Sequence, residues 1–394
     1  MKTLLLLVGV ATTTLACAPT LIPLRMRSAE DSCGPPSQEM APLASLGQDP
    51  KPFDVRYAPE ENDNLPSAQP TKTDIYTYRF EQENAGTEET LRAIVAPEGQ
   101  PPRVVGHRGL ALSRDSKAGW IREATGTEEN LYALVHLPIY KNGVSTEESN
   151  KQANSMAVGG HGTALLRTPD GVWQKETTGT DADLFAITRG GGSVVAVGAG
   201  GVMVERSAEG VWHDVPTYTK ANLYGIGRCM SHICAVGAGG VVVECAAPKG
   251  VLACVPREPP TKSDLYVVTD EEMFLGDGVW LGLTPTEKRD LYPPPLWSPW
   301  RFADDSVEKA DARAYANNHW MGIAGKLIAG RRGAAWLVGN WVITKKPVRR
   351  IQLPYAVDFY GASYNLVDGF LVGEKGTIVK VGVLGFVPPR MCLL

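Results

Sequence analysis

The chain has 394 residues, 43% of them hydrophobic, which is the composition of a folded globular protein long enough to bury a sizeable core. Its formal net charge at pH 7 is −4, and no stretch of the sequence gathers Lys and Arg into a basic stripe. We therefore expect no nucleic-acid partner, because binding to phosphates depends on clustered positive charge.

The N-terminus is typical of an export signal. Lys2 gives a short basic region, and residues 4–11 form an apolar core that is too short to span a bilayer as a mature helix. The segment 1–17 ends in Leu-Ala-Cys and resembles a bacterial lipoprotein signal peptide. That resemblance implies that Cys17 is lipidated, becomes the first mature residue and anchors the protein to a membrane through lipid only.

Two neighbours of Cys17 bear on this interpretation. Thr14 stands where such signals usually carry Leu, so ordinary cleavage after Ala16 or Ala18 is the alternative, and it would make the protein secreted or periplasmic. Ala18, and not Asp, follows Cys17, which by the same resemblance implies sorting to the outer membrane of a Gram-negative cell. We expect an outer-membrane lipoprotein.

The composition changes along the rest of the chain. Residues 18–71 are rich in Pro, Ser, Ala and Glu without an apolar period, which predicts a poorly ordered tether. Residues 72–394 consist of short apolar runs separated by Gly-rich turns, and we assign them to one β domain.

A repeat organises this domain. The segment LFAITRGGGSVVAVGAGGVMVER (184–206) is followed by LYGIGRCMSHICAVGAGGVVVEC (223–245), and Leu184 and Leu223 are 39 residues apart. A fixed period of about 40 residues indicates a repeat architecture. Each unit has short apolar runs and no helical period, which predicts a four-stranded antiparallel sheet. Stacking such sheets around an axis buries both of their apolar faces, as in a β-propeller.

Each unit has a glycine at the end of its second strand, so the number of such glycines gives the number of units. This glycine recurs at Gly106, Gly159, Gly198, Gly237, Gly276, Gly322 and Gly373. The predicted fold class is therefore all-β, a seven-bladed β-propeller of four-stranded antiparallel sheets, although a segment near Gly339 could be counted as an eighth unit. The segment TDIYTYRF (73–80) precedes the first counted strand. We expect this N-terminal strand to pair as the outer strand of the last blade and close the ring.

At this point the chain resembles the YVTN/BNR-type repeat β-propellers, a broad group that includes photosystem II assembly factor-like proteins. BNR repeats carry an Asp-box turn of the form S-x-D-x-G-x-T-W. Ser113, Asp115 and Trp120 have that spacing, and TPDGVW (168–173) and SAEGVW (207–212) are shortened versions. The resemblance implies a structural turn, in which the carboxylate accepts backbone N–H bonds and the Trp packs between sheets.

Seven cysteines are present, and six remain when Cys17 is set aside. An even number in an exported protein predicts disulfides. Two pairs flank hairpins within the repeat, and the last two cysteines lie near the chain ends, where a bond would lock the seam of the ring. The alternative is that the first of these, in the tether, pairs with nothing. The expected pairs are Cys229 with Cys234, Cys245 with Cys254, and Cys33 with Cys392.

No pattern of a known catalytic or metal site occurs in the sequence: there is no HExxH, CxxC, EF-hand, GxSxG or Walker segment. We therefore predict no catalytic residue, no metal and no cofactor. Sialidases share the Asp box, but they also need three arginines, an acid pair and a tyrosine, which the sequence does not place. We interpret His107, His161 and the arginine pairs 331–332 and 349–350 as solvated surface residues.

Two insertions interrupt the repeat, at residues 138–155 and 284–300, and in an up-and-down blade both loops belong to the same face. Pro-rich and aromatic loops lose little entropy on binding, which makes them good recognition surfaces. The alternative is that the tryptophans of the second insertion fill the fourth strand and its sheet interface. The expected partner-binding residues are Tyr140, Tyr292, Trp297 and Trp300.

The export signal, the repeat and the lack of a catalytic pattern favour a non-catalytic lipoprotein of the cell envelope. It would be a monomer that serves as a binding or assembly scaffold for an unidentified envelope protein or polysaccharide. The alternative is a sialidase-like or lyase-like enzyme acting on glycans. Carboxylates and arginines clustered around the central axis would favour the enzyme, whereas small and apolar residues there would exclude it.

Overall fold

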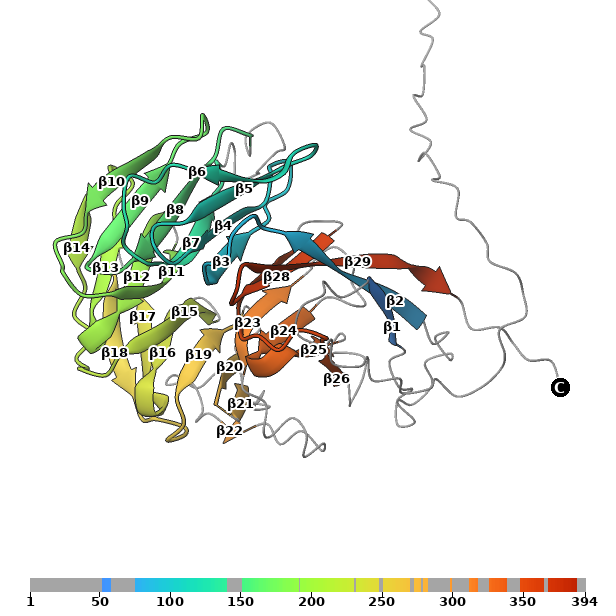
Figure 1. The fold of residues 1–394 in the computed structure, drawn as a ribbon. Helices are drawn as coiled ribbons and strands as arrows, with labels where there is room; N and C mark the ends of the chain where they lie inside the picture. Colours follow the sequence, from blue (N-terminus) through green and yellow to red (C-terminus); the bar gives the residue numbers. More distant parts are fainter. Residues whose placement is uncertain are drawn as a thin grey trace, which may run out of the picture. The chain divides into compact units, whose positions relative to one another are not determined.

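The structure is a computed structural model that describes residues 52–57, 75–139, 151–190, 192–229, 232–247, 251–269, 273–277, 279–282, 298–299, 312–317, 326–338, 348–364 and 368–387. These residues form β-strands joined by tight turns (Figure 1). No helix among them is long and apolar enough to cross a membrane.

The described strands form six antiparallel sheets of four strands and one sheet of five. The first sheet contains β3 (Leu91–Val95), β4 (Arg103–Gly106), β5 (Ala111–Asp115) and β6 (Gly119–Glu123). The second contains β7 (Leu131–Leu137), β8 (Asn154–Gly159), β9 (Thr163–Arg167) and β10 (Trp173–Thr177). The third contains β11 (Leu184–Gly190), β12 (Ser193–Gly198), β13 (Met203–Arg206) and β14 (Trp212–Asp214).

The remaining sheets continue in chain order. The fourth contains β15 (Leu223–Cys229), β16 (His232–Gly237), β17 (Val242–Ala246) and β18 (Ala253–Arg257). The fifth contains β19 (Leu265–Val268), β20 (Met273–Gly276), β21 (Val279–Gly282) and β22 (Ser298–Pro299). The sixth contains β23 (Ala312–Asn317), β24 (Lys326–Gly330), β25 (Ala334–Val338) and β26 (Val348–Gln352). The last contains β1 (Phe53–Tyr57), β2 (Ile75–Asn84), β27 (Phe359–Tyr364), β28 (Asp368–Gly373) and β29 (Thr377–Val387).

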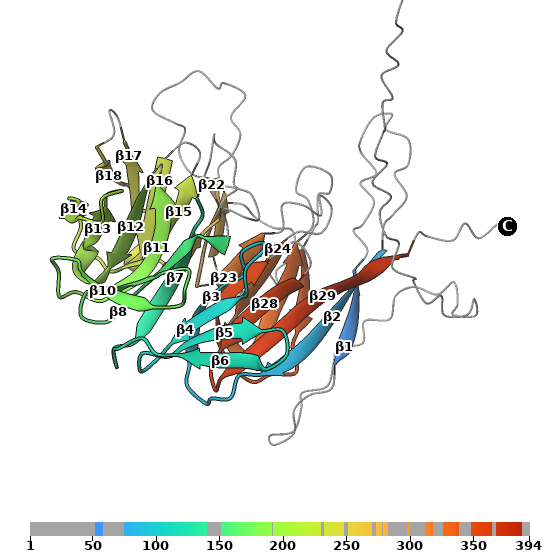
Figure 2. The same cartoon turned by 90° about the horizontal axis from the view of Figure 1, so that it is seen from above.

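The innermost strands close into a ring. Each contacts the next, from β3 through β7, β11, β15, β19 and β23 to β27, and β27 contacts β3. Figures 1 and 2 show the sheets following one another around a common axis in this order. The prediction of an all-β propeller built from antiparallel sheets is confirmed.

The closing sheet joins the two ends of the domain. As predicted, the N-terminal strand is the partner of the last strand: β2 pairs with β29 from Ile75 opposite Val387 to Asn84 opposite Thr377. Tyr78 and Phe80 of β2 are buried in the core cluster that also contains Leu371 of β28. The N-terminal strand is therefore held by both backbone pairing and apolar burial.

Three details of the prediction need correction. The closing sheet has five strands and not four, because β1 pairs along β2. This strand, Phe53–Tyr57, lies within the segment that composition assigned to the tether. The glycine of the sixth sheet that pairs with the first residue of the inner strand is Gly330, opposite Ala312, whereas Gly322 and Gly339 lie outside the described residues.

A repeated side-chain cluster joins neighbouring sheets at their outer strands. In the second sheet, Arg167 and Trp173 face each other across β9 and β10. Arg167 donates two hydrogen bonds to Glu123 of the first sheet, and the indole Nε1 of Trp173 donates a third, at 2.8 Å. The same cluster recurs as Glu176 with Arg206 and Trp212, and as Glu83 with Arg114 and Trp120. Since Glu83 lies on β2, these hydrogen bonds also attach the closing strand to the first sheet.

The Asp-box residues have the structural role that the resemblance implied. The Asp115 carboxylate accepts the backbone N–H groups of Lys117 and Ala118, each at 2.8 Å, and this holds the pKa of Asp115 below its ordinary value. Trp173 packs among residues of the first and second sheets. These contacts explain the turn and the sheet packing.

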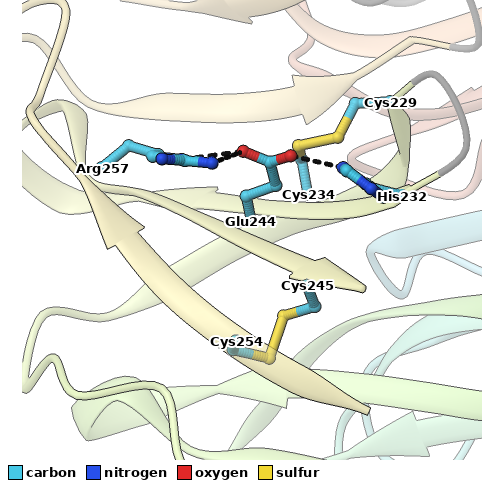
Figure 3. The surroundings of a disulfide bond; sticks show 7 residues. All are labelled: Cys229, His232, Cys234, Glu244, Cys245, Cys254 and Arg257. Carbon is cyan, nitrogen blue, oxygen red and sulfur yellow. Dashed lines mark hydrogen bonds and ion pairs between the residues drawn. A yellow bond between two sulfur atoms is a disulfide. The ribbon is translucent and has the colours of Figure 1, made fainter. Parts of the chain in front are cut away.

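Disulfides are present in the fourth sheet (Figure 3). Cys229 is bonded to Cys234 and Cys245 to Cys254, with Cα–Cα distances of 5.7 and 4.0 Å. Cys245 lies opposite Cys254, as Arg206 lies opposite Trp212 in the third sheet. A covalent bond thus occupies the place of an Arg–Trp pair. Cys17, Cys33 and Cys392 lie outside the described residues.

Candidate functional site

Each inner strand contains one extra residue at its second position. In the third sheet Leu184 pairs with Gly198 and Ala186 pairs with Val197, so Phe185 is skipped by the ladder. The pairing of the other six inner strands shows the same shift. A β-bulge of this kind re-aims the side chain of the extra residue. The bulged residues, which we call the ring residues, are Arg92, Tyr132, Phe185, Tyr224, Tyr266, Arg313 and Tyr360.

The repeated glycine makes room for the chain that enters each inner strand. A Cβ atom on Gly198 would lie 1.8 Å from the backbone carbonyl oxygen of Asp183, the residue before Leu184. That carbonyl accepts a 2.8 Å hydrogen bond from the N–H of Ala199. The repeated glycine, from which the number of units was predicted, is therefore required because two backbone segments approach closely next to the bulge.

Asp or Asn residues directly before five inner strands, β7, β11, β15, β19 and β27, accept a backbone N–H from a turn of the preceding sheet. Asn222 accepts a 2.9 Å hydrogen bond at Oδ1 from the N–H of Gly200, a residue with a φ of +64°. His161 occupies the corresponding turn position in the second sheet, also with a positive φ, and donates its N–H to Asp183. These hydrogen bonds hold the beginning of the inner strand, directly before the ring residue.

Four ring residues form a continuous aromatic arc. The ring centroids of Tyr132 and Phe185 are 5.6 Å apart, those of Phe185 and Tyr224 are 5.8 Å apart, and those of Tyr224 and Tyr266 are 5.2 Å apart. These distances fall within the range of attractive aromatic contacts. Because the four residues come from consecutive inner strands, the arc follows the circumference of the propeller axis.

The two ring arginines extend this arc at its ends. The guanidinium carbon of Arg313 lies 3.4 Å from the ring centroid of Tyr266, and that of Arg92 lies 4.2 Å from Tyr360 and 5.6 Å from Tyr132. These are cation–π distances. The ring residues therefore form one chain of contacts from Arg313 through the aromatic arc to Arg92 and Tyr360.

Acidic side chains surround part of the ring. Asp277 forms an ion pair with Arg313 at 2.9 Å and accepts a 3.3 Å hydrogen bond from the Tyr266 hydroxyl. Glu374 accepts a 3.3 Å hydrogen bond from the hydroxyl of Tyr360. Burial, followed by the nearby carboxylates, raises the pKa of Tyr266 well above its ordinary value, so its phenol stays protonated at neutral pH.

The structure does not describe the residues that the sequence predicts to bind a partner. Tyr140, Tyr292, Trp297 and Trp300 lie outside the described residues. The strand ends that carry the two insertions, after β7 and after β21, both lie at the end of their sheets opposite the ring residues. Arg331 and Arg332 are exposed at the turn after β24.

Sequence reasoning missed the ring because each of its members looks like an ordinary strand residue. The available signal was the second position of the repeated segments LRA, LYA, LFA, LYG, LYV, ARA and FYG, which is always aromatic or Arg. Only the bulge distinguishes this position from the buried residue beside it. The ring residues around the propeller axis are therefore neither purely apolar nor a dense cluster of carboxylates and arginines. They match neither of the two linings that would have distinguished a scaffold from an enzyme.

No protein-family model matches the sequence, and no curated protein matches it either. Among solved structures, YCF48 bound to a D1 peptide is 14% identical, with a TM-score of 0.54 over 82% of this chain and 97% of that chain. Virginiamycin B lyase from Staphylococcus aureus is 10% identical, with a TM-score of 0.61 over 77% of this chain and 99% of that chain. The β-propeller domain of Myceliophteria thermophila Cps50 (Swd1) is 12% identical, with a TM-score of 0.55 over 79% of this chain and 99% of that chain. At these identities the likeness shows the fold alone: the chain is a β-propeller.

Proposed function

We propose that this protein is a non-catalytic scaffold of the cell envelope that binds a segment of a partner protein at the ring residues. The observation that carries the proposal is the repeated bulge, which disrupts the ladder at the same position of every described inner strand. Bulges are features that re-aim side chains next to functional sites. Aromatic residues and Arg are the types that dominate binding hot spots.

The contacts within the ring favour a protein segment over a polysaccharide. Sugars bind to aromatic residues by stacking on an open ring face. Here guanidinium groups lie over Tyr132, Tyr266 and Tyr360, and Tyr224 is stacked on Tyr266 with an interplanar angle of 19°. What the ring offers is a combination of apolar surface, tyrosine hydroxyls and positive charge, which suits a polypeptide. A propeller with a bound peptide, YCF48, has a similar fold, and that likeness is consistent with this choice.

One group of residues favours the alternative, a sialidase-like or lyase-like enzyme. Tyr266, Asp277 and Arg313 contact one another, and a tyrosine with carboxylate and arginine neighbours could act on a glycan. A nucleophilic tyrosine needs a lowered pKa, however, whereas the pKa of Tyr266 is raised. Turnover of a sialoside or a uronate polysaccharide by the wild type, lost in Tyr266→Phe, would support the enzyme instead.

The envelope location in this proposal is supported by the sequence of residues 1–17. We expect that Cys17 is diacylated and that the propeller is tethered to the outer membrane. Metabolic labelling with an alkyne fatty acid should mark the wild type and leave Cys17→Ser unmarked. Equal labelling of both proteins would contradict lipidation and favour a secreted or periplasmic protein.

The binding role is tested by comparing captured proteins. Full-length wild type and the double variant Phe185→Ala/Tyr224→Ala are used to capture partners from the native envelope. The matched control, Ile121→Ala/Val255→Ala, removes exposed apolar side chains from the outer strands β6 and β18. The proposal requires a protein that is retained by the wild type and the control and lost with the ring variant. Equal retention by all three, with unchanged thermal unfolding, would refute it.

A further inference from the structure

Arg92 differs from Arg313, the other arginine among the ring residues. Its side chain is partly buried, its guanidinium carbon lies near the rings of Tyr132 and Tyr360, and its Nε atom is buried without a hydrogen-bond partner. Among the residues that the structure describes, it makes no ion pair with a carboxylate. The groups that act on its charge are the two tyrosines and a second cation, Arg313.

Arg313, at the equivalent bulge in the sixth sheet, is paired with Asp277 at 2.9 Å. Four partly buried arginines elsewhere are each paired with a carboxylate at 2.6 to 2.7 Å: Arg114 with Glu83, Arg167 with Glu123, Arg206 with Glu176, and Arg257 with Glu244. Arg103, which is 4% exposed, has no carboxylate partner among the described residues, but it donates hydrogen bonds to the side-chain oxygens of Gln100 and Ser155. Among the described residues, the fold therefore supplies each of these arginines with a carboxylate or, for Arg103, with neutral side-chain oxygens, and it gives Arg92 neither.

A buried guanidinium without a counter-ion is unfavourable, because burial costs hydration and no ion pair restores it. Burial is the largest reason that the pKa of Arg92 is lowered, and the nearby charge of Arg313 acts in the same direction. An anion placed against Arg92 would replace the lost hydration and satisfy free N–H donors. Arg92 is thus prepared to receive negative charge from a ligand.

The charges around Arg92 indicate which anion fits. Arg313 is already neutralised by Asp277, so the net positive charge available at this side of the ring is that of one guanidinium. A carboxylate carries one negative charge and matches the planar guanidinium fork. A phosphate carries nearly two negative charges and would face Asp277 and Glu374 with its second charge unmatched.

We infer that Arg92 is the recognition site for a carboxylate group of the bound protein segment, with the apolar part of that segment against the aromatic arc. This inference rests on the proposed binding role of the ring and names the chemistry that the ring selects. The carboxylate can be the free C-terminus of the segment or an Asp or Glu side chain within it. Both present the same group to Arg92.

The first test uses hexanoate, a short carboxylate with an apolar tail, and its neutral analogue hexanamide. Each is titrated into the full-length protein and followed by NMR signals of labelled arginine and histidine side chains. Saturable binding of hexanoate and not of hexanamide is expected, with a loss of about tenfold or more in Arg92→Gln, the size expected for a charge-assisted hydrogen bond. Arg92→Lys, which keeps the charge, should retain part of the affinity.

The control is Arg108→Gln, which removes an exposed arginine at the turn after β4 that pairs with Glu89. It should bind hexanoate like the wild type, so a loss there would indicate general attraction and not a site. Absence of saturable hexanoate binding, equal binding of hexanamide, or unchanged binding by Arg92→Gln would each overturn the inference. Because Arg92→Gln removes an uncompensated buried charge, we expect it to fold, and thermal unfolding verifies this.

Peptide probes distinguish the two sources of the carboxylate. Three alanine–leucine pentapeptides are compared: one with a free C-terminus, one with a C-terminal amide, and one amidated peptide with a central Asp. Binding of the first identifies a chain terminus, and binding of the third identifies a side chain. Binding of hexanoate, with no binding of the free-terminus peptide or of the Asp peptide, would contradict the inference that the ligand is a peptide. Loss of hexanoate binding in Arg92→Gln with unchanged partner capture would leave the ring as the binding site and remove only its carboxylate specificity.

Discussion

At the scale of single residues, the charge of Arg92 also acts on a neighbour, His107. This histidine follows β4, and its ring is edge-on to Tyr132 at 6.5 Å between centroids. Burial is the largest cause that lowers the pKa of His107 below its ordinary 6.5, Arg92 is the next, and Glu89 opposes them. The folded state therefore binds a proton less readily than the unfolded chain, so the stability linked to His107 is present above pH 6.5 and decreases as the pH falls below it.

We predict that Arg92→Gln raises the pKa of His107 because it removes a positive neighbour. The measurement is an NMR titration of the histidine Cε1–H signals in the wild type and the variant. His161, whose pKa is raised chiefly by its hydrogen bond to Glu129, is the internal control and should titrate alike in both proteins. An unchanged His107 titration would mean that the charge of Arg92 does not lower the pKa of His107.

Two glycines of one turn provide a second residue-scale prediction. Gly198→Ala should be strongly destabilising, by about 3 kcal/mol or more, because a Cβ atom there would meet the Asp183 carbonyl and the backbone cannot easily move. Gly200→Ala meets no atom within 4 Å and has only the cost of a positive φ, about 1 kcal/mol. Denaturant unfolding of both variants measures the difference. Equal losses would contradict the role given to the repeated glycine.

At the scale of elements, the Glu–Arg–Trp clusters join the outer strands of neighbouring sheets. Glu123 on β6 is bonded to Arg167 and Trp173 of the second sheet, and the side chains of Glu123 and Arg167 are only 13% and 9% exposed. Removing one partner of a buried ion pair leaves the other charge without compensation. These clusters are therefore sensitive to single substitutions at either end.

We predict that Glu123→Gln lowers the free energy of unfolding by about 3 kcal/mol, since Arg167 remains buried without a full counter-ion. The double variant Glu123→Gln/Arg167→Met should recover much of this loss because the unpaired charge is gone. Thermal and denaturant unfolding of the wild type, both single variants and the double variant form the required cycle. Losses that simply add would show that the pair is not coupled.

The sequence predicted the elements better than the site. Repeated glycines and short apolar runs predict strands and turns directly. At Gly198 and its equivalents another backbone segment lies so close that a side chain is excluded, and this requirement does not depend on the neighbouring side chains. The ring was not predicted, since a bulge depends on register between strands and the sequence shows only that Phe185 or Tyr224 follows a buried Leu. The counter-ion of Arg313 could not be predicted either, because Asp277 lies on the preceding sheet along the chain. The strand β1 was missed because its segment has the composition of a tether.

At the scale of the whole molecule, the ring depends on a seam between the two ends of the domain. The closing strand β2 supplies Tyr78 and Phe80 to the core, and its Glu83 accepts bonds from Arg114 and Trp120 of the first sheet. Backbone pairing with β29 extends along the whole of β2. In the described part of the chain, the seam is thus built from strand pairing, apolar burial and the partly buried ion pair between Glu83 and Arg114.

A variant that lacks residues 18–84 should lose cooperative thermal unfolding and expose apolar surface to a hydrophobic dye. Removal of β2 uncovers the last sheet and leaves Arg114 without Glu83. The control deletes residues 18–51, which precede β1, and should unfold like the wild type. Cooperative unfolding of the longer deletion near the wild-type temperature would show that the ring closes without its N-terminal strand.

Site-specific photo-cross-linking in the native envelope tests the central claim, that the ring residues bind a partner protein. Benzoylphenylalanine is placed at position 224, on the inner strand β15, or at position 255, on the exposed outer strand β18 of the same sheet. Our account predicts a discrete protein cross-link from position 224 that weakens in the Arg92→Gln background, and none from position 255. Cross-links from position 255 alone, or from neither position, would contradict the account.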